Sequence, residues 1–402
     1  MGSRNMKAKS DVQNCKTLIE AKSCRCLKVI VLFAPMLLIS LSYADPVING
    51  ISGSVSNASQ ITISGSGFGN GPQVVFFDDF EGGTLRQTIM TGPGSAVVGA
   101  WASSGRPATT YYASTSSVSG QLAFQASFHD NYYSYMRVAF PSIQTDVFMS
   151  YWFYLPPGDN APGEGNVAEG VNWKVVWLLG NLGAEMTHDD DQVIPCMNAR
   201  EGIWADRTYQ SSANDSPYHP YLYTGGGMTF EKGVWKNIKY YIHGATDTTG
   251  VYKFFSGESG GLNQVLNTIN VQTLDPDNDP DANYGYEGVH VNGYGRTTIN
   301  CHPTFDDVYV AVGAYAQARI EIGNASTYTA STRLAMSTPN TWSDTRITAT
   351  VRQGGFSNAE SAYLFVIDAN GIPSPGYPII FNSAPLADTI PPNMPLGLKL
   401  QK

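Results

Sequence analysis

Several segments of this chain alternate aromatic, basic or amide side chains with apolar ones, and these side chains are the ones that could bind a ligand. The candidate residues are Tyr133, Tyr135, Arg137, Lys174, Trp177, Asn237, Lys239, Tyr241, His243 and Tyr309. Aromatic rings stack on the apolar faces of sugar rings, while Arg, Lys, His and Asn bind hydroxyl and carboxylate groups. We therefore expect these residues to line one groove that binds a glycan; the alternative is a solvated outer face of a sheet.

Alternation with a period of two predicts β-strands as the elements that carry these residues. Strand-like runs occur at residues 121–126, 133–140, 147–155, 173–179, 235–243, 251–255 and 308–312, separated by Gly, Pro, Asn and Asp. So many runs, without helical periodicity, predict an all-β protein with a two-sheet sandwich.

Residues 73–323 contain an opening DDFEG, a middle NWKVVW, a later VWKNIKYYIH and a closing DDVYVAVG. In the order and wording of these motifs the segment resembles the concanavalin A-like lectin/glucanase jelly roll, of the LamG type. It implies a jelly-roll domain over these residues. That fold hosts lectins, glycosidases, polysaccharide lyases and inert spacers, so it does not by itself imply an activity.

The segments on either side resemble two parts of one IPT/TIG domain, an immunoglobulin-like module. Residues 46–71 contain ITISGSGFG, and residues 324–382 contain SDTRITATV followed by YLFVIDANG. Together they have the length of one small sandwich domain. We expect a jelly roll inserted into a smaller immunoglobulin-like β-sandwich, with Ile61 and Ile63 in the same core as Ile347, Ala349 and Val351.

The closing stretch also resembles a segment of alginate lyases, YFKAGxYxQ, because residues 309–317 read YVAVGAYAQ. It departs from that family at Ala311, where the family has Lys. Such lyases work by β-elimination, in which a Tyr or His takes the C5 proton of a uronate while Arg, Asn, Gln or His neutralises the carboxylate. The resemblance implies Tyr241, His243 and Arg137 as catalytic residues, with the other candidates binding substrate.

Glycoside hydrolysis is the competing chemistry, since it needs two carboxylates that flank the bond. The nearest match is Glu164, Asn166 and Glu169, where the central Asp of the jelly-roll glucanase motif is Asn. The surrounding Gly/Pro-rich sequence favours an exposed acidic loop, so we expect a lyase rather than a glycosidase if the protein is an enzyme.

Calcium is the cofactor that the sequence suggests. Four alternating carboxylates, Asp275, Asp277, Asp279 and Asp281, could converge on Ca²⁺, although they could equally form a solvated loop. The histidines show no HxH or HExxH spacing, so a catalytic zinc site has no support.

The first 44 residues are typical of a signal peptide: a basic segment, an apolar run at residues 29–41, and a small-x-small site ending at Ala44. Removing them takes away seven basic and two acidic residues and lowers the net charge from −9 to −14, which disfavours nucleic-acid binding. Cys196 and Cys301 would remain in an oxidising compartment, as a disulfide or as two separate thiols; we predict the disulfide. Residues 383–402 should form an extended tail.

Together these features predict a secreted or periplasmic protein that recognises an extracellular polysaccharide, with β-elimination as the catalytic extension. The alternative is a non-catalytic adhesin or cell-envelope protein whose jelly roll binds another partner.

Overall fold

The computed structural model describes residues 44–105, 109–114, 118–127, 134–159, 173–179, 192–198, 205–210, 222–223, 232–258, 261–271, 273–274, 285–292 and 301–382. Within these residues the regular structure consists of β-strands and a single turn of 3₁₀ helix, η3 (Tyr328–Ala330). The strands form three sheets. None of the described elements is a helix long and apolar enough to cross a membrane.

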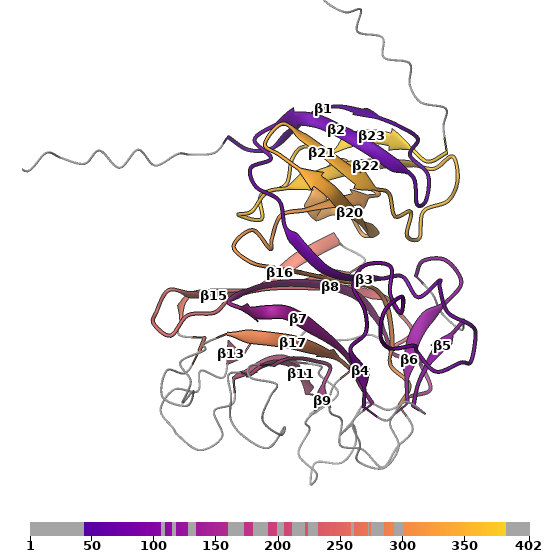
Figure 1. Cartoon of the computed structure of the whole chain (residues 1–402), viewed down its shortest axis with the longest axis vertical. Coiled ribbons are helices and arrows are strands. Elements are labelled where there is room, and N and C mark those ends of the chain that lie inside the picture. The colour runs from indigo at the N-terminus through magenta and orange to yellow at the C-terminus, as the bar shows by residue number, and fades with distance from the viewer. Residues whose placement is uncertain are drawn as a thin grey trace, which may run out of the picture. The chain divides into compact units, whose positions relative to one another are not determined.

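One eight-stranded sheet, which we call the β8 sheet, has the order β16-β15-β14-β8-β18-β6-β5, with β3 also paired to β18. Its strands are β3 (Gln73–Asp78), β5 (Thr110–Ala113), β6 (Ala123–Ala126), β8 (Asp146–Tyr154), β14 (Lys236–His243), β15 (Gly250–Glu258), β16 (Gly261–Val271) and β18 (Thr304–Val312). All of its pairings are antiparallel, including β14 with β8 and β18 with β8. Figure 1 labels β3, β5, β6, β8, β15 and β16 of this sheet.

A second eight-stranded sheet, the β17 sheet, has the order β13-β12-β11-β10-β17-β7-β4, with β9 also paired to β11. Its strands are β4 (Ser103–Ser104), β7 (Met136–Gln144), β9 (Trp173–Lys174), β10 (Val176–Leu179), β11 (Gln192–Asn198), β12 (Ala205–Gln210), β13 (Leu222–Tyr223) and β17 (Tyr286–Val291). These strands also pair in antiparallel fashion, as β17 does with both β7 and β10.

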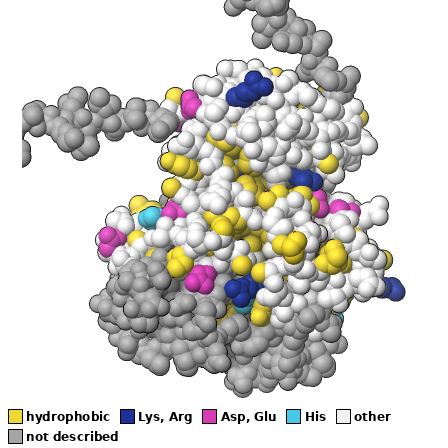
Figure 2. Space-filling model, viewed as in Figure 1, with side chains coloured by type: hydrophobic (Ala, Val, Ile, Leu, Met, Phe, Trp, Pro, Cys, Tyr) yellow, Lys and Arg dark blue, Asp and Glu magenta, His cyan; other side chains and the backbone are white. Residues whose placement is uncertain are grey.

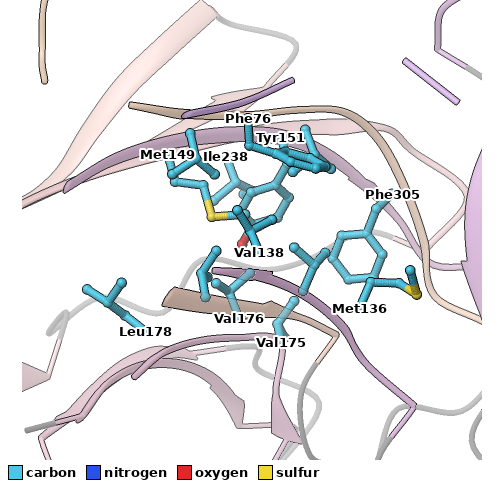
Figure 3. Close-up of a cluster of buried hydrophobic side chains, with 14 of the residues drawn as sticks. Phe76, Met136, Val138, Met149, Tyr151, Val175, Val176, Leu178, Ile238 and Phe305 are labelled. Carbon is cyan, nitrogen blue, oxygen red and sulfur yellow. The ribbon is translucent and has the colours of Figure 1, made fainter. Parts of the chain in front are cut away.

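The two eight-stranded sheets pack face to face over a large apolar core. Met136 and Val138 of β7 and Leu178 of β10 meet Met149 and Tyr151 of β8 in one cluster of buried side chains (Figure 3). Every second residue of these strands points into this core, as alternation with a period of two requires. The predicted fold class, an all-β protein with a two-sheet sandwich, is confirmed.

The third sheet has seven strands in the order β1-β2-β21-β20-β19-β22-β23. They are β1 (Val47–Ser52), β2 (Gln60–Ser66), β19 (Arg319–Gly323), β20 (Leu334–Trp342), β21 (Arg346–Thr350), β22 (Ser361–Ile367) and β23 (Tyr377–Ile380). Strand β20 changes partner along its length: Ser337 pairs with Ile320 of β19, whereas Trp342 pairs with Ile347 of β21.

Strand β2, near the start of the described chain, pairs with β21 more than 270 residues later. Ile61 faces Ala349 and Ile63 faces Ile347, and these four residues share one buried cluster with Val351. The expected common core of the two flanking segments is therefore present. Their assignment to an IPT/TIG domain, and the concanavalin A-like assignment of the insertion, stay predictions.

One predicted domain boundary is wrong. The sequence predicts residues 319–323 at the end of the jelly roll, but they form β19, which pairs with β20 and β22 of the seven-stranded sheet. The chain leaves the β8 sheet after Val312 and turns through residues 313–318. Residues 1–43 of the predicted signal segment lie outside the described residues. The predicted tail, residues 383–402, also lies outside them.

Candidate functional site

A row of three polar or aromatic side chains crosses the middle of the β17 sheet. Arg137 of β7 pairs with His290 of β17, and His290 pairs on its other side with Trp177 of β10. Directly paired residues point to the same face of a sheet. The residues next to them in sequence, including Val138 and Val289, belong to the core between the sheets, so the row lies on the face turned away from that core.

Tyr135 completes this group, which we call the Tyr135 site: Tyr135, Arg137, Trp177 and His290. The rings of Tyr135 and His290 stack with centroids 3.7 Å apart and planes at 9°. Trp177 meets the His290 ring edge-on, with centroids 6.0 Å apart and planes at 81°. His290 and Trp177 are buried, at 1% and 5% exposure, whereas Tyr135 and Arg137 are half-buried. Tyr135 and Arg137 are therefore the members of the site that solvent reaches.

The electrostatics of the site make His290 neutral. Burial disfavours the imidazolium and, together with the neighbouring charge of Arg137, lowers the pKa of His290 to about 3. Nδ1 of His290 and Nε of Arg137 are buried and have no hydrogen-bond partner among the described residues. Buried polar groups are rarely left unpaired, and those that are call for an explanation such as a catalytic role or a bound water or ion.

The short strand β4 positions Tyr135. The backbone N–H of Gly105 donates to the carbonyl oxygen of Tyr135 at 2.9 Å. A Cβ atom at Gly105 would lie 2.4 Å from Cε1 of the Tyr135 ring, so the absence of a side chain makes room for that ring. Tyr135 thus lies in contact with Gly105, which directly follows β4, and with His290 of β17.

The structure brings together three of the predicted site residues, Tyr135, Arg137 and Trp177. It adds His290, for which the sequence predicts no role and whose spacing from the other histidines does not fit a zinc site. A signal was present, since Val289 and Val291 flank His290 and alternation would have placed it on the face opposite the core.

The predicted catalytic residues Tyr241 and His243 lie elsewhere, on β14 of the β8 sheet. The Tyr241 hydroxyl donates to Oδ1 of Asp146 at 2.6 Å, and Nδ1 of His243 lies 2.9 Å from the same oxygen. Burial and the Asp146 carboxylate raise the pKa of Tyr241, which makes its phenolate harder to form. The prediction that these two residues share one groove with Arg137 is wrong, because they belong to the opposite sheet of the sandwich.

Three predicted substrate-binding residues are also on the β8 sheet, and all are buried: Asn237, Lys239 and Tyr309. Nζ of Lys239 pairs with Oε2 of Glu321 in β19 at 2.8 Å. Tyr309 packs in an apolar cluster with Phe77 and with Met336 of β20. This face of the β8 sheet is covered by protein and does not form an open groove.

The remaining candidate residues lie outside the described part of the chain, in whole or in their side chains. They are Tyr133, the side chain of Lys174, the carboxylates Asp275, Asp277, Asp279 and Asp281, the segment 164–169, and the side chain of Cys196. Cys301 is buried. The disulfide and the calcium site stay predictions.

Comparisons with known proteins add only partial likenesses. No family model matches the sequence, and no curated protein does. Similar solved structures include an endo-β-1,4-glucuronan lyase from the fungus Trichoderma reesei, with 14% identity over 61% of this chain and 98% of that one at a TM-score of 0.41. An alginate lyase from Aplysia kurodai has 12% identity over 60% and 100%, with a TM-score of 0.41.

A β-glucanase catalytic domain from Podospora anserina, of the class GH131, is also similar, with 12% identity over 61% of this chain and 98% of that one and a TM-score of 0.30. Proteins of different activity thus appear together at these low sequence identities and TM-scores. We therefore base a functional proposal on the residues of the Tyr135 site.

Proposed function

We propose that this protein binds an acidic polysaccharide at the Tyr135 site and cleaves it by β-elimination. The observation that carries the proposal is the row Arg137–His290–Trp177, in register across three strands, with Tyr135 stacked on its centre. Aromatic rings supply stacking surfaces for sugar rings, and a guanidinium pairs with a carboxylate through charge-assisted hydrogen bonds.

The reaction needs few groups from the protein. A base removes the proton from C5 of a uronate, the electron pair forms a C4–C5 double bond, and the bond from C4 to the glycosidic oxygen breaks. The departing oxygen then takes up a proton. Neutralising the carboxylate attached to C5 stabilises the negative charge that develops there, so one cation and one proton-transfer group suffice.

We assign the carboxylate to Arg137 and the proton transfer to the hydroxyl of Tyr135, because these are the two half-buried groups of the site. His290 lies under the Tyr135 ring and fixes its plane. Since the pKa of His290 is lowered to about 3, its ring adds no positive charge beneath the phenol at neutral pH. Trp177, buried beside His290, would support the sugar-binding surface from below.

The setting in the cell is part of the same proposal. Polysaccharides of this kind lie outside the cytoplasm, which agrees with the predicted signal peptide at residues 1–44. On the face drawn in Figure 2, the charged side chains of the described residues are few and scattered. The proposal itself relies on Arg137 as a single local cation.

The test is turnover on a panel of polyuronates and neutral glucans, followed by absorbance near 230–240 nm, where the new double bond absorbs. We expect product from a polyuronate, near-complete loss in Tyr135→Phe, and a large loss in Arg137→Ala. The matched control is Tyr111→Phe, which removes the hydroxyl of another half-buried tyrosine, in β5, that donates to Gln125.

The outcomes separate the competing functions. Glycan binding without product would leave a recognition protein and rule out the elimination. Product that survives in Tyr135→Phe but disappears in Tyr241→Phe would return catalysis to the β8 sheet, as the sequence first suggested. Neither binding nor turnover on any glycan would favour the adhesin that recognises another kind of partner.

A further inference from the structure

Asn292 stands directly after β17, one residue beyond Val291. Its side chain and backbone are fully buried, and its φ is 58°, in the left-handed region. Apart from glycine, Asn is among the residues that enter this region most readily. The turn at Asn292 ends the strand that carries His290.

This one residue bonds to both neighbours of β17. Its backbone N–H donates to the carbonyl oxygen of Val175 at 2.7 Å, and Nδ2 of its side chain donates to the carbonyl oxygen of Ser134 at 2.7 Å. Val175 lies just before β10, two residues from Trp177, and Ser134 directly precedes Tyr135. The side-chain amide therefore takes the place of the ladder bond that the turning backbone can no longer make.

Ser134 is itself held from two further sides, which makes the anchor firm. Its hydroxyl donates to the carbonyl oxygen of Ser127 at 2.8 Å and lies 2.7 Å from the hydroxyl of Thr109. Ser134 is 1% exposed. Because a backbone carbonyl accepts only, the Asn292 amide must present Nδ2 to it, and this fixes the orientation of the side chain.

We propose that Asn292 is a positioning residue of the Tyr135 site: by joining Ser134 and Val175, it holds Tyr135 stacked on His290 and Trp177 beside it. The effect on catalysis rests on the proposed function. The hydrogen bond from Asn292 to Ser134 is independent of it. Oδ1 of Asn292 is buried without a partner among the described residues, so within that part of the chain the side-chain amide bonds only to Ser134.

Two substitutions separate the amide from the turn. Asn292→Gly keeps a residue that accepts the left-handed backbone and deletes the amide, whereas Asn292→Asp keeps the shape and replaces the donor by an oxygen that faces the Ser134 carbonyl. The control is Asn382→Gly, in the loop after β23. Asn382 has φ 54°, and its backbone and side chain also donate hydrogen bonds, to Val55 and Asn358.

Two readouts are needed. The first is turnover: we expect kcat to fall on the order of 10- to 100-fold in Asn292→Gly and Asn292→Asp, the scale of a small misplacement of a reacting group, with KM nearly unchanged. Asn382→Gly should keep the wild-type kcat. The second is the titration of the His290 ring by NMR, assigned with His290→Gln.

In the wild type, His290 should stay neutral as the pH falls to 5, because it is buried and faces the charge of Arg137. In Asn292→Gly the titration midpoint of the His290 ring should rise toward that of a solvated histidine. In Asn382→Gly the same midpoint should not change. Wild-type kinetics and an unmoved His290 midpoint in Asn292→Gly would overturn the inference. If the wild type turns over no polyuronate, the proposed function fails, yet the His290 titration still decides whether Asn292 holds the site.

Discussion

At the scale of single residues, His290 is the centre of the candidate site, although it is its most buried member. It touches Tyr135 through a stacked ring and Trp177 through an edge, and it pairs with Arg137 across the ladder. A histidine in this position must be neutral to be buried beside a guanidinium. Its neutrality is therefore a property that stability measurements can detect.

His290 should make the protein less stable as the pH falls. The folded protein holds His290 with a pKa of about 3, while the unfolded chain has the ordinary value near 6.5. Between these values the unfolded state binds a proton that the folded state does not, so the free energy of unfolding decreases as the pH drops. From pH 7 to pH 5 this amounts to about 2 kcal/mol.

The measurement is urea unfolding of the wild type and of His290→Gln at pH 7, 6 and 5. The difference in unfolding free energy between the two should shrink by about 2 kcal/mol over that range, because all other titrating groups are common to both. Trp177→Phe, which alters packing on the same face without a titrating group, should run parallel to the wild type. Parallel curves for His290→Gln would show that His290 takes up its proton in the folded state.

The sequence predicts which types of side chain could bind a ligand, but not which face of which sheet each of them occupies. Alternation singled out Tyr135 and Arg137, which the structure groups around His290, yet it gave no reason to prefer them over Tyr241 and His243. Trp173, Val175 and Trp177 alternate in sequence, but the strand is interrupted at Val175, and both Val175 and Val176 enter the core. The interruption at Val175, between β9 and β10, decides which face of the sheet Trp177 occupies. The sequence pattern does not predict this interruption.

At the scale of elements, the difference between β7 and β14 lies in what covers them. Both strands carry alternating polar side chains, but β14 belongs to the sheet whose outer face packs against β19 and β20. Lys239 and Glu321 meet there, and Glu321 also accepts hydrogen bonds from Arg319 and from the hydroxyl of Tyr328 at 2.6 Å. Local sequence reports that a face is polar, but not that another element covers it.

Lys239, Arg319 and Glu321 do not contribute equally to this contact. Burial lowers the pKa of Lys239 to about 8, while Lys239 and Arg319 together lower the pKa of Glu321 against the opposing effect of its own burial. Glu321 is thus the anion that two buried cations share. Removing it takes from both buried cations the carboxylate that they share.

Glu321→Gln should therefore destabilise the protein by about 3–5 kcal/mol, as expected for breaking a buried ion pair from one side. Lys239→Met should cost less, because Glu321 keeps Arg319 and Tyr328 as partners and methionine fills a similar volume. Chemical unfolding of the two variants at pH 7 gives the comparison. An equal or larger loss in Lys239→Met would mean that Lys239, and not Glu321, is the centre of the cluster.

At the scale of the whole molecule, the chain begins and ends its described course in the seven-stranded sheet and builds both eight-stranded sheets in between. The described residues between 44 and 382 nevertheless belong to one compact unit by their contacts. The sequence predicts the insertion because the two flanking fragments resemble two parts of one domain. It places the point where the chain returns to the seven-stranded sheet too late, at residue 324 instead of residue 319. Alternation continues on both sides of Gly313 and Ala314, so the turn at residues 313–318 looks like a hairpin within one sheet.

The corrected return point leads to a comparison of two deletions. Removing residues 73–318 and joining the ends with about ten Gly and Ser residues keeps β19, whereas removing residues 73–323 deletes it. Strand β19 lies between β20 and β22, and its Ile320 and Ile322 are buried in the core that also holds Ile61 and Ile347. Arg319 and Glu321 pair with each other in the same strand, so β19 does not depend on Lys239 for a counter-charge.

We expect the first deletion variant to fold with a cooperative thermal transition, and the second to lack one, because it loses a central strand and two core isoleucines. Circular dichroism during heating measures both. Cooperative folding of both variants would make β19 dispensable to the smaller sandwich and would restore the later boundary. If neither folds, the seven-stranded sheet depends on the β8 sheet through the contacts of Met336 and Lys239, and the split domain is not an independent folding unit.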